Sequence, residues 1–440
     1  MRAELLALAL GAIAMMPACG GRSSGGDASE PGAGQWYAGD FHVHTSVASN
    51  DTRYPDGSVR SFPEVIGDTA RARGMSFVVL TDHSNSAGSR VDTTVEDAQL
   101  WNRGPEFPLW DRAAELSSAD FLMIDGSELS PVSTLAPEQC ENCPTVGTGQ
   151  LTPVGHVGCI PGHLSDFDRS GAFVDRPPGQ VLGGSGIAQC HARGGFAIVN
   201  HPFYRVTPWI DYDWTSFDYD ALEVWNGSAG FASFDSFAYD AYLCDRLEGR
   251  SVVAVGGSDN HRTPLPYEDE VTLALGAPLG LPMTSVFAER LEWDAIMAGV
   301  RRGRVVIHER GTFVEFRAFA ADGAELGWVG DTISGPHPDA LVRLHARSPR
   351  TQQLRVVRVA PGACEDRRTA GRDVFPVVQH TVVFSEEICS AGPCELTRDV
   401  PIALQPGLYY ASVGELTILS LNIRDVALTN VLSVRAAEPG

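Results

Sequence analysis

The amino-acid sequence predicts an α/β fold over residues 36–303, followed by a small β-sandwich-like domain over residues 304–440. In the first region short apolar runs alternate with helical patterns, which is typical of a parallel sheet built from βα units. In the second region apolar and polar residues alternate with a period of two between turns rich in Gly and Pro, without helical stretches. The chain is long enough for two or three domains.

The first region contains the apolar runs that a buried parallel sheet needs. Ser61 and Glu64 form a capping-box pattern, and Pro63 between them predicts the start of a helix. Residues 288–303 predict the last helix of the series. After the strand around Phe41 and Val43, the expected strands are 76–83, 121–128, 154–160, 196–202, 220–226 and 251–261. In the second region they lie within 304–320, 340–348, 353–360, 380–387, 407–414 and 426–435.

The N-terminus has the pattern of an export signal. Arg2 precedes an apolar run from Leu5 to Met16 that is too short to span a bilayer. Ala18 directly before Cys19 resembles a bacterial lipobox, so we interpret residues 1–19 as a lipoprotein-type signal peptide, with an ordinary secretory signal as the alternative. Residues 20–35 are rich in Gly and Ser and predict a flexible linker. We therefore expect an exported protein, held in the bacterial cell envelope by a lipid anchor on Cys19.

Composition excludes several functional classes. The net charge of −22 argues against nucleic acid as a partner, because phosphate binding depends on basic patches. All 33 basic residues are arginine, which excludes Schiff-base chemistry, pyridoxal-phosphate enzymes and the lysine of a phosphate-binding P-loop. Catalysis must therefore depend on histidine, carboxylates, cysteine or a metal.

The cysteines indicate disulfides, because an even number remains without Cys19 and the protein is expected in an oxidising compartment. Cys140 and Cys143 could form a bridge or half of a zinc knuckle, and the bridge is favoured. We expect Cys364 to pair with Cys389 or Cys394.

Polar residues that suit metal binding stand at the ends of the apolar runs. Because strands of a βα barrel end on one face, these side chains should converge there. Burying so many imidazoles and carboxylates without a cation would be costly, so the pattern predicts a metal site. The residues are His42, His44, Asp82, His83, Glu128, His156, His201, Asp259 and His261.

Seven segments carry a resemblance to a known family. They are "GDFHVHTS", "VVLTDHSN", "DGSELS", "GHVGCIP", "GGFAIVNHPF", "DALEVWNG" and "VAVGGSDNHR", within residues 36–303. Together they resemble the PHP (polymerase and histidinol phosphatase) superfamily, most closely its CehA/McbA-like branch of metallohydrolases. The resemblance implies a distorted (β/α)7 TIM-like barrel with two or three divalent metal ions at the strand ends.

Ligands follow from the resemblance by motif. His42, His44, Glu128 and Asp259 would hold one ion, and Glu128, bridging the two, would hold a second with His156 and His201. His83 and His261 match a pair that helps to hold a third ion. Where some relatives have a further histidine this chain has Asn50, followed by Asp51, so we expect two tightly held ions. Imidazole and carboxylate ligands suit Zn, Mn or Fe.

Catalytic and substrate-binding roles are expected for residues in and near the motifs. Glu128 and Asp82 are the expected catalytic residues, Asp82 as an acid that orients a ligand or moves a proton, or else as a simple turn residue. Trp225 and Asn226 would line the substrate mouth. Arg262 would pair with an anionic group, or else lie in solvent as a surface arginine.

The expected function is that of an exported metal-dependent hydrolase. It would use a metal-bound hydroxide to cleave phosphate esters or related ester or carbamate bonds in a small, anionic substrate. The alternative is a surface binding lipoprotein whose barrel keeps metals for structure or for ligand capture.

Overall fold

The computed structural model describes residues 34–49, 52, 58–84, 99, 101–133, 152–153, 155–175, 183–203, 212, 214, 216–227, 233–263, 277–370, 375–416 and 423–437. Residues 34–440 form one compact unit, distinct from residues 1–33. The expected signal peptide, most of the linker, Cys19, the Cys140–Cys143 pair, Asn50 and Asp51 lie outside the described residues. Among the described helices, none combines the length and apolar character that a membrane crossing needs.

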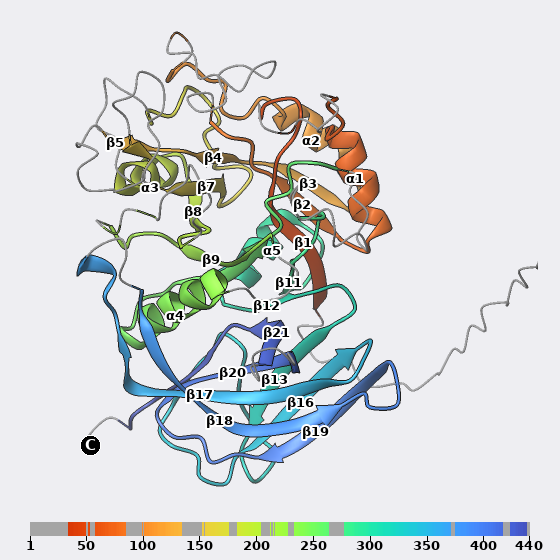
Figure 1. Cartoon of the computed structure of the whole chain (residues 1–440), viewed down its shortest axis with the longest axis vertical. Coiled ribbons are helices and arrows are strands. Elements are labelled where there is room, and N and C mark those ends of the chain that lie inside the picture. The colour runs from red at the N-terminus through yellow and green to blue at the C-terminus, as the bar shows by residue number, and fades with distance from the viewer. Residues whose placement is uncertain are drawn as a thin grey trace, which may run out of the picture. The chain divides into compact units, whose positions relative to one another are not determined.

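Two sheets hold the strands of the N-terminal part of the described chain, residues 34–303, apart from one separate pair of short strands (Figure 1). Parallel bridges join the sheets where strands end, between Val43 and Asn260 and between His83 and Glu128. Because these bridges lie next to the expected ligands, the closure itself gathers the polar side chains. One of the two is an 11-stranded sheet, the large sheet, which continues beyond residue 303 and has here the order β12 (Val305–His308), β11 (Met283–Ala288), β1 (Gln35–Val43), β2 (Phe77–Leu80) and β3 (Leu122–Asp125). The other has the order β10 (Val253–Gly257), β9 (Ala221–Asn226), β8 (Gly195–Asn200), β7 (His156–Pro161) and β4 (Ser127–Leu129).

The expected parallel sheet is present in only part of this fold. Strands β1, β2 and β3 are parallel to one another, as are β8, β9 and β10. However, β7 runs antiparallel to both β4 and β8, and β11 runs antiparallel to both β1 and β12. Every residue of β7 is buried, and a continuous apolar run indicates burial on both faces without indicating direction.

Five α-helices are described, and they pack against these strands: α1 (Pro63–Ala72), α2 (Trp110–Leu116), α3 (Gly183–Ala192), α4 (Ser233–Leu247) and α5 (Trp293–Arg301). The predicted helix start at Pro63 is confirmed, but the capping box is not, because Phe62 is the N-cap and makes no side-chain cap bond. The Ser61 hydroxyl instead donates to the His261 carbonyl and accepts from the Thr263 amide. Ser61 therefore ties the start of α1 to the loop after β10.

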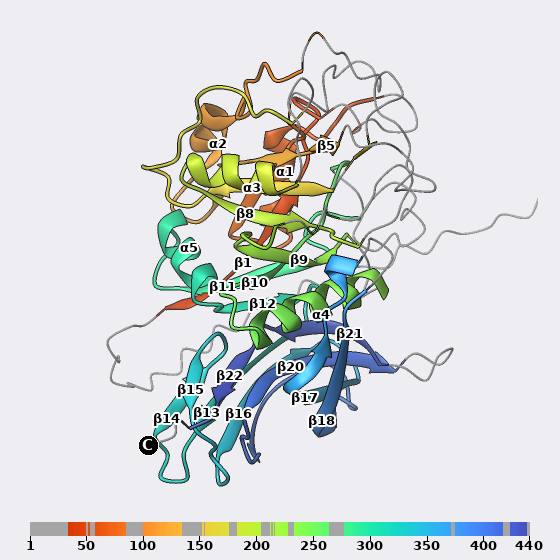
Figure 2. The same ribbon diagram turned by 90° about the vertical axis from the view of Figure 1, so that its left-hand side faces the viewer.

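The C-terminal part is all-β apart from one short 3-10 helix, Arg368–Ala370, among the described residues. A four-stranded sheet shares an apolar core with strands of the large sheet, including Phe316, Leu344, Val356 and Tyr409. Figure 2 shows these two layers of strands. The four-stranded sheet has the order β14 (Glu325–Trp328), β13 (Phe313–Phe319), β16 (Leu341–Ser348) and β19 (Cys394–Pro401). The facing strands are β15 (Thr332–Ser334), β17 (Gln352–Glu365), β18 (Val377–Ile388), β20 (Gly407–Leu416), β21 (Ile423–Thr429) and β22 (Leu432–Arg435). In the N-terminal part, strands β5 (Val132–Ser133) and β6 (Thr152–Pro153) form a separate two-stranded sheet.

The sheet runs without a break across the expected boundary at residues 303 and 304. Strand β12 pairs with β11 on one side and with β21 on the other. The Asn430 side-chain oxygen accepts from the Tyr242 hydroxyl at 2.9 Å and from the Ala254 amide at 3.0 Å. The two parts are therefore joined by a shared sheet and by buried hydrogen bonds to α4 and β10.

Disulfides differ from the expected pairing. Cys364 bonds to Cys244 of α4, 120 residues away in sequence, and Cys389 bonds to Cys394. A third bridge joins Cys159 of β7 to Cys190 of α3. The expected partners of Cys364 were wrong because a distant pairing depends on α4 packing against β17, which spacing along the chain does not reveal.

Candidate metal centre

Glu128 lies at the centre of a buried cluster of imidazoles. Its backbone amide donates to the Asp82 carbonyl at 2.9 Å, which fixes the start of β4 beside the end of β2. The carboxylate oxygens of Glu128 lie 3.0 to 3.6 Å from a ring nitrogen of each of five histidines, His42, His44, His83, His156 and His201. This arrangement brings together residues from distant strands around one carboxylate.

His42, His44 and Asp259 converge at one side of Glu128. The Asp259 amide donates to the His42 carbonyl, and the His44 amide donates to the Asn260 carbonyl, each at 2.9 Å. These bonds align the ends of β1 and β10. His42 Nε2 and His44 Nε2 are 3.1 Å apart, and they lie 3.4 and 3.1 Å from Asp259 Oδ1.

Those three separations test whether the residues fit a metal ion. Ligand atoms about 2.0–2.1 Å from a tetrahedral ion are about 3.3 Å from one another. The separations of 3.1, 3.4 and 3.1 Å among these three atoms match that spacing. In two further groups the ligand atoms lie within 4.8 Å of one another, namely His83 with Glu128 and His156, and His44 with His83 and His261. The donor set therefore fits divalent cations.

Glu223 belongs to the cluster although sequence reasoning missed it. Its Oε1 lies 3.0 Å from His42 Nδ1, and its Oε2 accepts from the His201 amide at 2.8 Å. Glu223, His42 and His201 also form a possible metal-binding group. Asn200, likewise missed, donates from its side chain to Glu128 Oε1 at 2.9 Å. Both residues could have been noticed in the sequence as polar residues inside apolar runs, Glu223 in "DALEVWN" and Asn200 in "FAIVNHP".

A bulge in β9 explains the positions of Trp225 and Asn226. The register against β10 shifts after Glu223, so Val224 is an extra residue and the alternation of faces moves by one. Asn226 consequently faces Glu223 and donates to its Oε2 at 2.9 Å. Trp225 turns into the apolar core, where it is completely buried. Its expected place at the substrate mouth stays a prediction.

The open side of the cluster lies at Asp259 and His261. Both side chains are about 20% exposed, whereas the Glu128 side chain is 1% exposed. Asp259 and His201 have positive φ angles of 50° and 30°, a region that non-glycine residues rarely adopt. Arg262, half-buried, follows His261 directly. Backbone strain at two of the clustered residues indicates that their side-chain positions are specified by the surrounding structure.

Asp82 stands behind the cluster and does not enter it. Its Oδ1 accepts from the Thr45 amide at 2.6 Å and from the Ser49 hydroxyl at 2.8 Å. Ser49 Oγ also lies 3.1 Å from His44 Nδ1, so a chain of contacts runs from Asp82 through Ser49 to His44. Burial raises the pKa of Asp82 to about 6, although the bonds from Thr45 and Ser49 oppose the shift. The geometry suits a residue that positions His44.

Electrostatics divide the histidines into two types. Burial, together with the charges of His261 and His83, lowers the pKa of His44 to about 3, and burial lowers the pKa of His156 to about 4. Burial also opposes protonation of His42, but nearby carboxylates outweigh it and hold the pKa of His42 well above its usual value. The cluster thus combines two neutral imidazoles, His44 and His156, with a negative field from the carboxylates, and the raised pKa of His42 shows that this field favours a positive charge.

Comparisons with known proteins give only distant likenesses. No family model matches the chain, and no curated protein matches it. A two-domain protein from Bacteroides vulgatus containing a predicted PHP-like metal-dependent phosphoesterase is similar in structure, with 15% identity and a TM-score of 0.41, covering 91% of this chain and 96% of that one. A candidate metal-dependent phosphoesterase from Bifidobacterium adolescentis has 15% identity and a TM-score of 0.31, covering 52% of this chain and 89% of that one. Neither likeness carries an argument about activity.

Proposed function

We propose that the protein is a metal-dependent hydrolase of the PHP type that cleaves phosphate esters or related ester or carbamate bonds. The observation that carries the proposal is the buried carboxylate of Glu128, whose oxygens lie close to five imidazoles. Burying such a group without a cation would be costly, and its open side at Asp259 and His261 can admit a substrate. The two sheets that close at their strand ends are consistent with the distorted (β/α)7 barrel and C-terminal sandwich that the resemblance implies.

Two groups of residues would hold the ions. His42, His44 and Asp259 would hold one, and His156 with His201 would hold the other. Glu128 would serve both, because its Oε1 lies near His42 of the first group and near both histidines of the second, while its Oε2 lies near His44. Divalent ions in such a site lower the pKa of water and stabilise developing negative charge on an ester oxygen.

The protein's own residues then orient the ligands. Glu223 accepts a hydrogen bond from Nδ1 of His42 and leaves Nε2 facing Asp259. Asp82 acts through Ser49 on His44, so we propose that it positions this histidine and does not contact the substrate. Arg262, beside the open side, is the proposed partner for an anionic substrate group.

The test measures turnover of a panel of p-nitrophenyl esters, namely a phosphate, a phosphodiester, an acetate and a carbamate, with Mn or Zn added. Activity on at least one substrate that disappears on chelation and returns with metal supports the proposal, and the preferred substrate identifies the bond. Bound metal without turnover of any substrate would favour the alternative, a binding lipoprotein that keeps metal for structure or capture. Glu289→Gln, which alters an exposed carboxylate away from the cluster, should keep the activity and serves as the control variant.

Location is a separate proposal that rests on residues 1–19 alone. We propose export and lipid attachment at Cys19, because Ala18 and Cys19 follow a short apolar segment. Cys19→Ser should release the protein from membranes when it is expressed in a bacterium. Mass spectrometry of the membrane fraction, showing whether the mature chain begins with a diacylglyceryl-modified cysteine, provides the direct measurement.

A further inference from the structure

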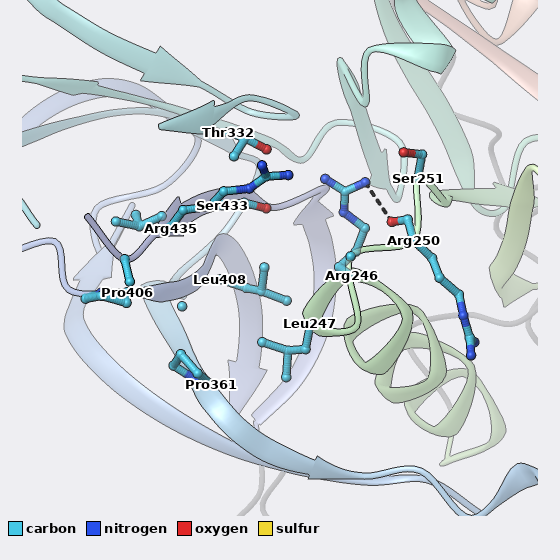
Figure 3. Close-up of a pocket in the computed structure, with 14 residues that line it drawn as sticks. Arg246, Leu247, Arg250, Ser251, Thr332, Pro361, Pro406, Leu408, Ser433 and Arg435 are labelled. Atoms are coloured by element: carbon cyan, nitrogen blue, oxygen red, sulfur yellow. Dashed lines mark hydrogen bonds between the residues drawn. The ribbon is translucent and has the colours of Figure 1, made fainter. Parts of the chain in front are cut away.

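A pocket of about 400 Å³ lies where the end of α4 meets strands of the C-terminal part, and it shares no lining residue with the metal cluster (Figure 3). Its volume is within the range of pockets that hold small molecules. The lining comes from α4 and the loop after it, and from β15, β17, β20 and β22. The proposed hydrolase function does not involve this pocket.

Two arginines give the pocket a local positive charge. Figure 3 shows the Arg246 and Arg435 side chains pointing toward one another, although the whole protein carries a net charge of −22. Arg246 Nη1 donates to the Arg250 carbonyl at 3.2 Å, while its buried Nε makes no hydrogen bond. Arg250 differs, because it pairs with Asp245 at 2.6 Å and Glu248 at 2.7 Å. The described residues supply no carboxylate partner to Arg246 or Arg435.

The end of α4 explains only one of these charges. A cation in the last turn interacts favourably with the partial negative charge at a helix C-terminus, and Arg246 occupies that position. Arg435 comes from β22, and its charge repels that of Arg246. An oxyanion between the two guanidinium groups would relieve this repulsion and supply an acceptor for Nε of Arg246.

The opposite wall of the pocket is apolar. Leu247, Leu408, Pro361 and Pro406 line it, and Figure 3 shows Leu247, Leu408 and Pro361 on the side away from Thr332 and the two guanidinium groups. The hydroxyl groups of Thr332 and Ser433 stand near the charged side. A free inorganic anion would leave this apolar wall uncovered, whereas an anion with an apolar body would cover it.

We propose that this pocket binds a small amphiphilic anion, with its carboxylate or phosphate between Arg246 and Arg435 and its apolar body against Leu247 and Leu408. The proposal is independent of the metal centre. The pocket at the junction of the two parts of the chain is then a second ligand site.

Isothermal titration calorimetry on the full chain tests this with octanoate and octyl phosphate as the two head groups, and with octanol and acetate as matched controls. At least one amphiphilic anion should bind at one site per chain, octanol should bind on the order of tenfold more weakly because it lacks the charge, and acetate should give no saturable heat. The head group with the higher affinity identifies the ligand class.

Variants locate the binding. Arg246→Gln and Arg435→Gln should each weaken it about tenfold, since each removes one charge-assisted contact, and Arg343→Gln at an exposed ion pair should not change it. Because a metal centre can also bind anions, the titration is repeated in Asp259→Asn, where affinity should be unchanged. Equal binding of octanol, no binding of either amphiphile, unchanged affinity in both arginine variants, or loss of binding in Asp259→Asn would each overturn the proposal.

Discussion

Glu223 Oε1 lies 3.0 Å from Nδ1 of His42, and this contact determines which nitrogen of the imidazole faces the cluster. A proton on Nδ1 that is donated to Glu223 leaves Nε2 free to face Asp259 at 3.4 Å. Carboxylates in this position fix the tautomer and the ring orientation of metal-binding histidines.

Glu223→Gln should therefore reduce metal affinity and turnover by about 10- to 100-fold while the fold is retained. The amide can keep only part of the network, because the carboxylate accepts from His42, from the His201 amide and from Asn226. Metal titration and steady-state kinetics measure the effect, with the exposed Glu289→Gln as the control. Wild-type values for both quantities would show that Glu223 is only a structural acid.

His42→Ala and Asp259→Ala should each abolish turnover, because each removes an expected ligand from the open centre. Circular dichroism should show that both variants fold, since both side chains contact the polar cluster at the strand ends. Retention of more than about a tenth of the wild-type rate in either variant would contradict the assignment.

Arg368 and Asp245 form a buried ion pair that joins the C-terminal part to α4. Both side chains are 0% exposed, with Arg368 Nη2 2.6 Å from Asp245 Oδ1. Arg368→Met should lower the free energy of unfolding by about 3–5 kcal/mol, because it leaves Asp245 buried with one fewer partner. Urea denaturation measures this, and Arg343→Met at the exposed pair with Asp399 should leave the free energy of unfolding almost unchanged, because solvent screens that pair. Equal losses in the two variants would argue against the pair.

His308 should make stability depend on pH. Burial lowers its pKa to about 4, below the ordinary value of 6.5, so the unfolded chain binds a proton in the interval where the folded chain does not. The contribution is present above pH 6.5 and is lost as the pH falls toward 4. His308→Asn, which keeps a donor for the Glu309 carbonyl, should therefore be less sensitive to acid than the wild type. Urea denaturation from pH 7.5 to 4.5 tests this, and parallel losses in both proteins would contradict it.

Much of the candidate centre could be predicted because its residues stand at the ends of apolar runs. His42, His83 and Asp259 all follow this rule, since strand ends gather on one face. Glu223 could not be found in the same way, because it lies inside β9 and depends on a bulge to share a face with Asn226. Strand direction at β7 and the pairing of Cys244 with Cys364 depend on distant packing, which local patterns do not encode.

The number of divalent ions that the chain retains is the most direct measure of the proposed metal centre. His44, His83 and His261 form a third compact group, but His44 Nε2 already faces Asp259 and His44 Nδ1 faces Ser49, and each nitrogen can serve only one ion. Elemental analysis after exhaustive dialysis against metal-free buffer without added phosphate should therefore give close to two divalent ions per chain. A chain that retains no metal would contradict the metal centre itself, and close to three would show that the third group is a complete site.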